Sequence, residues 1–210
     1  MLKRTLVVLS LAILSQQAFA DTSPWMMRVR AVNLDTANQS DAIPSLSVPE
    51  DAIHVSNKVI PEFDVSYFFN NRWAAELVLT YPQEHDVTVT ESAVGSFKAG
   101  SFKHLPPTLM LQYHFDGSDT FRPYIGAGLN YTLMSDVHLA VPDVTTLDLE
   151  HDSFGAAFQA GFDYRLNDRL FLNIDLKKIY IDSDVYASGS KVSHVDVDPL
   201  AFAIGLGWFF

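Results

Sequence analysis

The sequence predicts an all-β protein, an eight-stranded antiparallel transmembrane β-barrel with short periplasmic turns and longer extracellular loops. Three observations support this prediction. Large apolar residues alternate with small or polar residues along most of the chain, the alternation falls into eight segments, and the connections between segments are short and long in turn. Such alternation is typical of a strand whose two faces meet different surroundings. Barrels of the outer membrane of Gram-negative bacteria combine such strands with such connections.

The first 20 residues have the pattern of a cleavable secretory signal peptide. Lys3 and Arg4 precede an apolar run, and Ala18-Phe19-Ala20 forms a small-x-small cleavage site. The apolar run is shorter than the roughly 20 residues of a membrane-spanning helix, and an N-terminal anchor or buried helix is the alternative. We therefore expect residues 1–20 to be removed and residues 21–210 to form one outer-membrane β-barrel domain.

The composition excludes several classes of protein. A formal net charge of −11 argues against a nucleic-acid-binding protein, which needs a basic surface. The chain has no cysteine, so its stability comes from hydrogen bonding and packing rather than from disulfides or thiolate metal sites. The longest apolar stretch, Leu200 to Phe210, is interrupted by Gly205 and Gly207 and is too short, at eleven residues, for a helical membrane span.

The alternation is clearest near the C-terminus, where Phe202 and Ile204 share one face and Ala203 and Gly205 share the other. The eight predicted strands cover residues 25–34, 57–69, 72–84, 103–115, 121–134, 152–166, 169–186 and 191–210. Three connections are predicted to be tight polar turns: 70–71, 116–120 and 167–168. The others are mostly longer, are rich in Ser, Asp, Pro and Gly, and are predicted to be loops: 35–56, 85–102, 135–151 and 187–190.

A water-soluble β-sandwich is the alternative fold. Its outward face would be consistently polar, whereas the face opposite the large apolar residues is here often Gly or Ala. Small residues suit the crowded interior of a narrow barrel whose large apolar face contacts lipid. Closure of the barrel also gives every strand hydrogen-bond partners that lipid cannot offer. Aromatic residues lie where interfacial girdles are expected, near the short turns and at the C-terminus: Tyr67, Phe69, Trp73, Tyr113, Phe115, Phe121, Trp208 and Phe210.

Four segments resemble the OmpW family of outer-membrane proteins. They are His104-Leu105-Pro106-Pro107-Thr108-Leu109, Phe121 to Tyr131, Gly155 to Tyr164, and the terminal strand after Asp198-Pro199. The resemblance extends over the whole chain and is weakest in the predicted loops. It implies an eight-stranded barrel with both termini in the periplasm. It also implies passage of small hydrophobic molecules through a narrow apolar channel that opens sideways into the membrane. Members similar to AlkL are associated with alkane uptake, and others with colicin reception or stress.

Pro106 and Pro107 lie at the start of the fourth predicted strand. Proline has no N–H to donate to a strand ladder, so two in succession should interrupt pairing with a neighbour. One interpretation is a simple kink where the chain enters the strand. The other is a lateral opening in the wall, through which an apolar solute leaves the channel, and the resemblance favours it.

Several polar residues point inward by alternation and predict a network that blocks the lower lumen, because buried charges must be paired or hydrated. They are Arg28, Arg30, Asp64, Glu76, Gln112, His114, Arg122, Asn130, Gln159, Asp163, Asn173, Asp175 and Lys177. Eight strands leave an interior only about wide enough for side chains, so an open aqueous pore is not expected. Phe68, Val78 and Met110 also point inward and are candidates for the lining of an apolar upper channel. Lys177 lies where a bulky apolar gate is expected, which leaves the gate unassigned.

Neither catalysis nor metal binding is predicted. Five histidines fall in or near the predicted loops without metal-ligand spacing and are interpreted as solvated surface: His54, His85, His138, His151 and His194. The triplet His151-Asp152-Ser153 has catalytic residue types, but neighbours on a strand point to opposite faces. No G-x-S-x-G nucleophile motif is present.

The sequence and the resemblance together predict a passive outer-membrane channel for uptake of small hydrophobic molecules, with lateral exit through the barrel wall and no cofactor. The alternative is a structural, receptor or adhesion barrel without transport, such as a colicin receptor. The expected partners are outer-membrane lipid, small hydrophobic solutes and, transiently, the barrel-assembly machinery, which would recognise Trp208 and Phe210 as a C-terminal signal. Nucleic acid is not an expected partner.

Overall fold

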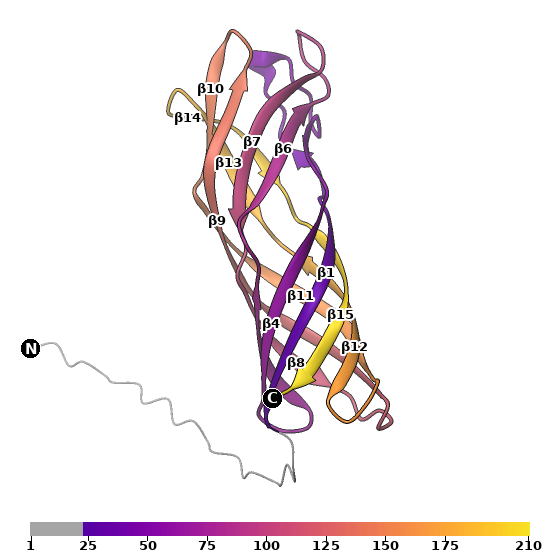
Figure 1. The fold of residues 1–210 in the computed structure, drawn as a ribbon. Coiled ribbons are helices and arrows are strands. Elements are labelled where there is room, and N and C mark those ends of the chain that lie inside the picture. The colour runs from indigo at the N-terminus through magenta and orange to yellow at the C-terminus, as the bar shows by residue number, and fades with distance from the viewer. Residues whose placement is uncertain (1–22) are drawn as a thin grey trace, which may run out of the picture.

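The alternating segments form a closed ring of eight antiparallel strands in the computed structural model, which describes residues 23–210 (Figure 1). The strands are β1 (Trp25–Asp35), β4 (Lys58–Phe68), β5 (Trp73–Leu79), β8 (Thr108–His114), β9 (Phe121–Val141), β11 (Asp152–Arg165), β12 (Leu170–Ile179) and β15 (Leu200–Phe209). Each pairs with the next in this order, and β15 pairs back onto β1, where Arg28 lies opposite Gly207. The predicted eight-stranded barrel is confirmed. The predicted signal peptide lies outside the described residues.

The large apolar side chains point outward from this ring. On β15, Phe202, Ile204 and Leu206 are between 42% and 49% exposed, whereas Ala201 and Ala203 on the opposite face are at most 1% exposed. A water-soluble sandwich would bury the large face, so the arrangement excludes that alternative. Among residues 23–210, no helix is long and apolar enough to cross a membrane.

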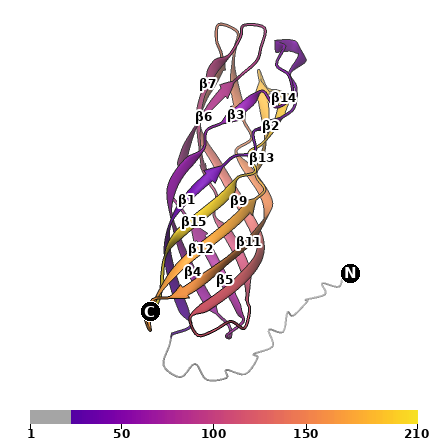
Figure 2. The same ribbon diagram turned by 90° about the vertical axis from the view of Figure 1, so that its right-hand side faces the viewer.

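The short turns, the start of β1 and the C-terminus lie together at the periplasmic end of the barrel, which is drawn at the bottom in Figures 1 and 2. The backbone N–H of Phe210 donates to Trp25 O at 3.2 Å, which holds the last residue against the first strand. In two of the turns an asparagine side chain accepts hydrogen bonds from the backbone beyond it, Asn70 from Trp73 N at 3.0 Å and Asn167 from Leu170 N at 3.0 Å. These Asx contacts explain why the turns are so tight.

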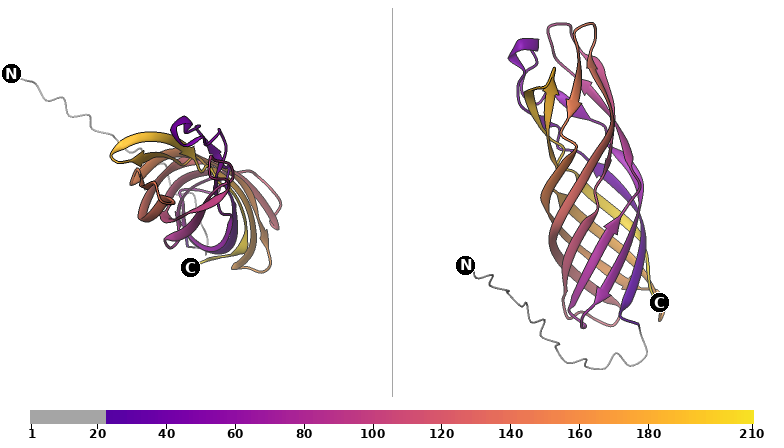
Figure 3. Two further views of the ribbon diagram at one scale, coloured as in Figure 1. Left: turned by 90° about the horizontal axis from the view of Figure 1, so that it is seen from above. Right: turned by 90° about the vertical axis from the view of Figure 1, so that its left-hand side faces the viewer.

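Above the membrane barrel stands a second array of strands (Figures 1 and 3). It contains the upper part of β9 and β2 (Gln39–Ser40), β3 (Ile53–Val55), β6 (Gln83–Val89), β7 (Phe97–Leu105), β10 (Thr145–Leu149), β13 (Asp182–Ala187) and β14 (Ser190–Asp196), with the short 3-10 helix η1 (Pro44–Leu46) at the top. We call this array the extracellular extension. Its strands run from β9 through β10, β13 and β14 to β2 on one side, and through β7 and β6 to β3 on the other.

The prediction that residues 85–102 and 135–151 are loops is therefore wrong in large part. These segments contain β6, β7, the upper part of β9 and β10. Their inward residues, among them Val87, Val89 and Leu139, do alternate with outward polar ones. The register shifts at Val87/Thr88 and at Ser101/Lys103, together with a high content of Ser, Asp and Gly, obscure this alternation.

The outward side chains change from apolar to charged at the upper edge of the hydrocarbon region. Leu79 on β5 and Leu109 on β8 are 41% and 56% exposed. Directly above them, the outward side chains form exposed ion pairs, Lys98 with Asp86 at 2.9 Å and Lys103 with Asp136 at 2.8 Å. Charges of this kind belong in water rather than in lipid, so β6 and β7 lie above the membrane-spanning part of the barrel.

Candidate functional site

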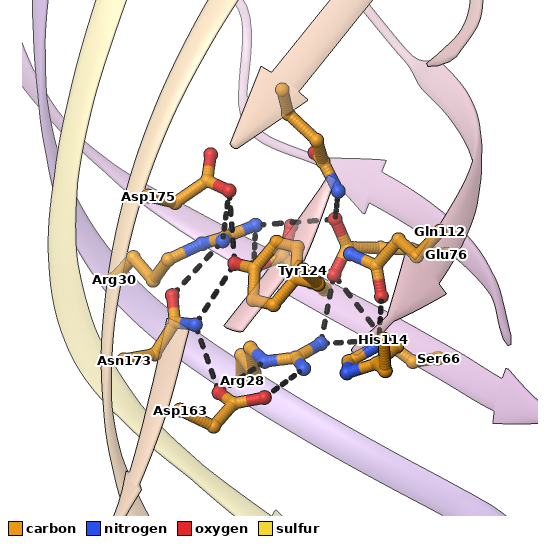
Figure 4. Close-up of polar contacts among 12 residues, drawn as sticks. Arg28, Arg30, Ser66, Glu76, Gln112, His114, Tyr124, Asp163, Asn173 and Asp175 are labelled. Carbon is orange, nitrogen blue, oxygen red and sulfur yellow. Dashed lines mark hydrogen bonds and ion pairs between the residues drawn. The ribbon is translucent and has the colours of Figure 1, made fainter. Parts of the chain in front are cut away.

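Arg28 occupies the centre of a polar network inside the membrane barrel (Figure 4). Its Nη1 donates to Ser66 Oγ at 2.7 Å and to Glu76 Oε2 at 2.8 Å. Its Nε and Nη2 donate to the two carboxylate oxygens of Asp163 at 3.2 Å and 2.7 Å. Two-pronged contact of a guanidinium with a carboxylate is the strong geometry for this pair.

Arg30 lies one inward position higher on β1, where it holds two more carboxylates and shares Glu76 with Arg28. Its Nε is 2.9 Å from Glu62 Oε1, and its Nη2 is 2.7 Å from Asp64 Oδ2 and 3.5 Å from Glu76 Oε1. Its Nη1 donates to Asn173 Oδ1 at 3.1 Å. Glu76 thus contacts both arginines and joins the two halves of the network.

The network extends around the rest of the lumen through neutral and charged partners. Lys177 Nζ donates to both oxygens of Glu62 at 3.2 Å. Tyr124 donates its hydroxyl to Asp175 Oδ2 at 2.9 Å, and Gln159 Nε2 donates to Glu76 Oε1 at 3.4 Å. We call these residues, with those bonded to Arg28 and Arg30, the plug. Because Arg28, Asp64 and Glu76 are wholly buried, no solvent-filled passage adjoins these described side chains.

Small residues on the neighbouring strands make room for the plug. A Cβ added to Gly205 would lie 2.6 Å from Arg30 Cα and 2.8 Å from Arg30 Cγ, and one added to Gly126 would lie 2.8 Å from Gln159 Cγ. Real Cβ atoms essentially never come so close. The small face seen in the sequence is therefore the face against which the long polar side chains pack.

Most residues of the predicted polar network meet in the plug. Arg28, Arg30, Asp64 and Glu76 make the contacts above, as do Gln159, Asp163, Asp175 and Lys177. Gln112 is wholly buried, and its one side-chain hydrogen bond within residues 23–210 joins its Oε1 to His114 Nε2 at 3.1 Å. Arg122 lies lower, with its Cζ 5.8 Å from the centre of the Phe68 ring.

Three plug residues were missed by the sequence prediction: Glu62, Ser66 and Tyr124. The signal was present, because Glu62 and Ser66 flank Asp64 at intervals of two and Tyr124 follows Arg122 at the same interval. Their residue types obscured this pattern. A tyrosine in a membrane strand suggests a position at the membrane–water interface. Glu62 follows Pro61, and a proline suggests an interruption of the strand.

Below the plug, the lumen ends in an apolar cluster of Met26, Phe68, Ala74 and Phe171. The Phe68 ring lies 5.4 Å from that of Phe209. The prediction assigned Phe68 to an apolar upper channel, but the structure places it at the periplasmic end. Alternation identifies the inward face of a strand without giving the height of a residue along the barrel.

Above the plug, the extracellular extension encloses an apolar cavity of about 40 Å³, which we call the chamber. All of its described lining residues except Ser183 are apolar. They come from most strands of the extension and from η1, and include Ile43, Ile53, Val87, Phe102, Leu139 and Val185. Val78 and Met110, two of the predicted lining residues, belong to the same buried apolar cluster. Val78 pairs with Asp64 and Met110 pairs with Glu76, so both lie at the level of the plug rather than in the chamber wall.

The barrel wall is interrupted between the chamber and the plug. The β5–β8 ladder ends at the pair Val78–Thr108, and the β6–β7 ladder begins at the pair Gln83–His104. Between these pairs lie the buried Pro106 and the half-buried Pro107 on one strand, and the exposed Pro82 on the other. We call this unpaired stretch the seam.

The seam is open on one side only. On the β9 side, Tyr131 N donates to Pro107 O at 3.1 Å, so that pairing continues. Toward β5 and β6, no residue pair is formed between Val78–Thr108 and Gln83–His104. The nearby side chains bond elsewhere: Thr80 Oγ1 donates to Pro61 O on β4 at 3.1 Å, and Gln83 Nε2 donates to Thr80 Oγ1 at 2.8 Å. The sequence analysis predicted an interruption at Pro106 and Pro107 but not the matching proline on the neighbouring strand.

The histidines and the C-terminal aromatics are placed as follows. His54, His138 and His151 are exposed and His194 is partly exposed, as expected for surface residues, but His85 is wholly buried, so its prediction as solvated surface is wrong. Among the described residues, no three His, Cys, Asp or Glu side chains form a metal site.

Ser153 Oγ bonds to Asp182 Oδ1 at 3.0 Å. Trp208 pairs with Met27, and Phe210 is 56% exposed; their role as an assembly signal stays a prediction.

The profile of the OmpW family matches residues 23–210. This chain belongs to the OmpW family. Outer membrane protein W of Vibrio cholerae is 37% identical over 70% of this chain and 71% of its own length. The dibenzothiophene metabolism operon protein PahQ of Pseudomonas aeruginosa is 29% identical over 99% of both chains, and outer membrane protein AlkL of Ectopseudomonas oleovorans is 25% identical over 78% of this chain and 71% of its own.

Solved structures agree with the family assignment. The crystal structure of the outer membrane protein OprG from Pseudomonas aeruginosa matches with a TM-score of 0.76 and 31% identity, over 89% of this chain and 95% of that one. As a barrel of the OmpW family, the protein resides in the outer membrane, and lipid contacts its outward apolar face.

Proposed function

We propose that this OmpW-family barrel is a passive channel that takes up small hydrophobic molecules and releases them sideways into the outer membrane. The observation that carries this proposal is the vertical order of three features. The apolar chamber lies on top, the charged plug lies below, and the seam interrupts the wall between them. An apolar solute in the chamber therefore reaches the seam before it reaches the plug.

The plug is a poor route for such a solute. To pass it, the solute would have to separate charged side chains that are buried and paired, and each buried charge left without its partner costs several kcal/mol. The seam is a better route, because its outer rim carries the exposed apolar residues Leu79, Tyr81 and Leu109. Transfer from water to lipid supplies the driving force, so neither an energy source nor a cofactor is needed.

The relatives support a hydrophobic solute. PahQ is named for a dibenzothiophene metabolism operon, and dibenzothiophene is an apolar aromatic compound. The resemblance noted in the sequence associates the family with passage of such molecules. We infer passage rather than catalysis, because Ser153 Oγ bonds to Asp182 and, within residues 23–210, to no histidine that could take its proton.

Uptake by whole cells tests the proposal. Radiolabelled decane is supplied to cells that carry the wild-type protein, no protein, or a variant with Pro82→Ala, Pro106→Ala and Pro107→Ala. The variant regains three backbone N–H donors with which β5–β6 can pair with β7–β8. Pro142→Ala, in an exposed turn, is the matched control.

We expect faster uptake with the wild type and with Pro142→Ala than in cells without the protein, and slower uptake with the triple variant at equal surface abundance. Equal uptake in all strains would contradict transport and favour the structural or receptor alternative. Faster uptake that the triple variant retains would contradict the lateral exit.

A further inference from the structure

Two buried histidines lie next to the chamber, on neighbouring strands of the extension. His85 on β6 and His104 on β7 are 0% and 1% exposed. Their ring centres are 4.6 Å apart and their planes are inclined at 68°. The ring of Phe102, which lines the chamber, is 6.0 Å from His85 and 6.3 Å from His104. The two imidazoles therefore lie just behind the apolar wall.

The hydrogen-bonding capacity of these rings is largely unused. His85 Nδ1 is 2.6 Å from Ser56 O. A carbonyl oxygen can only accept, so Nδ1 carries the proton and donates, and Nε2 is left with a free lone pair. Among the described residues, neither His85 Nε2 nor either nitrogen of His104 has a partner. Buried polar atoms without partners are rare, and a ligand is one explanation for them.

Both rings are neutral around neutral pH. Burial lowers the pKa of His104 to about 3 and also lowers the pKa of His85. A neutral His104 has one N–H donor and one acceptor nitrogen. Together the pair thus offers an acceptor fixed on His85 and a donor on His104.

This combination matches a hydroxyl group, which donates one hydrogen bond and accepts others. A ketone can accept from His104 but cannot donate to His85, and a hydrocarbon can do neither. A carboxylate likewise cannot donate to His85. It is also repelled, because the charged side chains buried within residues 23–210 comprise five carboxylates and three cations. The chemistry therefore selects a neutral solute with a single hydroxyl.

We propose that His85 and His104 recognise the hydroxyl group of an otherwise hydrophobic solute as it passes from the chamber to the seam, which begins at the pair Gln83–His104. The alcohol O–H donates to His85 Nε2, and its oxygen accepts from the His104 N–H. This rests on the proposed function and names the solute class as aliphatic or aromatic alcohols. The channel then favours an alcohol over a hydrocarbon of the same length.

The test compares decane with decan-1-ol in cells with the wild type, His104→Phe, His104→Gln or His54→Phe. His54 is exposed on β3 and serves as the control. For each strain, the protein-dependent rate is the rate above that of cells lacking the protein. We expect the ratio of decanol rate to decane rate to fall about two- to tenfold in His104→Phe, the range for one or two neutral hydrogen bonds. His104→Gln should retain part of the ratio, and His54→Phe all of it.

A ratio unchanged by His104→Phe, with decane uptake still accelerated, would overturn the hydroxyl recognition while leaving the proposed channel intact. A second measurement does not depend on transport. The ¹⁵N imidazole resonances of the purified protein in lipid nanodiscs are recorded during titration with decan-1-ol and with decane. Shifts of the His85 and His104 signals with decanol alone support recognition. The absence of shifts with decanol overturns it, even if neither compound is taken up faster by cells.

Discussion

Glu76 is the residue on which the closure of the lumen most depends. It lies 2.8 Å from Arg28 Nη1 and 3.5 Å from Arg30 Nη2, and it accepts a further hydrogen bond from Gln159. All of these groups lie in the membrane-spanning part of the barrel, where water cannot compensate a lost partner. The plug is thus a set of mutually dependent pairs, and the loss of one charge exposes the others.

Replacement of Glu76 by the nearly isosteric glutamine should therefore destabilise the barrel strongly. We expect a loss of about 3–5 kcal/mol in the free energy of unfolding, because two buried guanidinium groups lose a shared counter-charge. Urea unfolding in lipid vesicles measures it. Glu84→Gln, on the exposed outer face of β6, should change the stability by less than about 1 kcal/mol. Equal effects of the two changes would contradict the pairing described for the plug.

At the residue scale, alternation predicted well which side chains point inward, but it predicted less well what surrounds each of them. It identified nine of the plug residues, because side chains point to alternate faces of a strand whatever their type. It could not place Phe68, since height along the barrel depends on strand register. It also missed the burial of His85, because β6 pairs with β3, which is distant in the sequence, as well as with β7.

At the scale of strands, the seam is a property of two neighbouring strands together. Pro106 and Pro107 interrupt one of them and Pro82 interrupts the other at the same height. The predicted strand 72–84 ran through Pro82, because residues on both sides of it alternate. A single proline reads as a local kink, and only the pairing of β5 with β8 and of β6 with β7 shows that the interruptions coincide.

The barrel closes at the junction between β1 and β15. Substitutions of the glycines there test how small residues pack against the plug. A Cβ at Gly205 would meet the backbone at Arg30 Cα, 2.6 Å away, whereas one at Gly207 would first meet Met26 Cε, the flexible end of a side chain, at 2.7 Å. We expect Gly205→Ala to cost about 1–3 kcal/mol and Gly207→Ala distinctly less, measured by the same unfolding assay. A larger cost for Gly207→Ala would contradict this packing.

At the scale of the whole molecule, the barrel is divided along its axis into four levels: the chamber, the seam, the plug and the periplasmic apolar cluster. The membrane-spanning levels follow from the sequence because lipid imposes one strict rule on every strand. The extension is harder to predict from the sequence, because its outer face meets water and its ladders contain register shifts such as that at Val185/Tyr186. In the proposed channel, which is apolar above and charged below, the exit lies between the two.

Photocrosslinking with a decyl diazirine, followed by mass spectrometry of the purified protein in nanodiscs, tests this path most directly. The account predicts labelling of chamber residues such as Phe102 and Met134 and of inward residues at the seam, Pro106 and Thr108, with the plug and the periplasmic cluster unlabelled. Labelling of Phe171 and Met26 beneath the plug would show that solutes pass straight through the lumen, and it would contradict lateral exit.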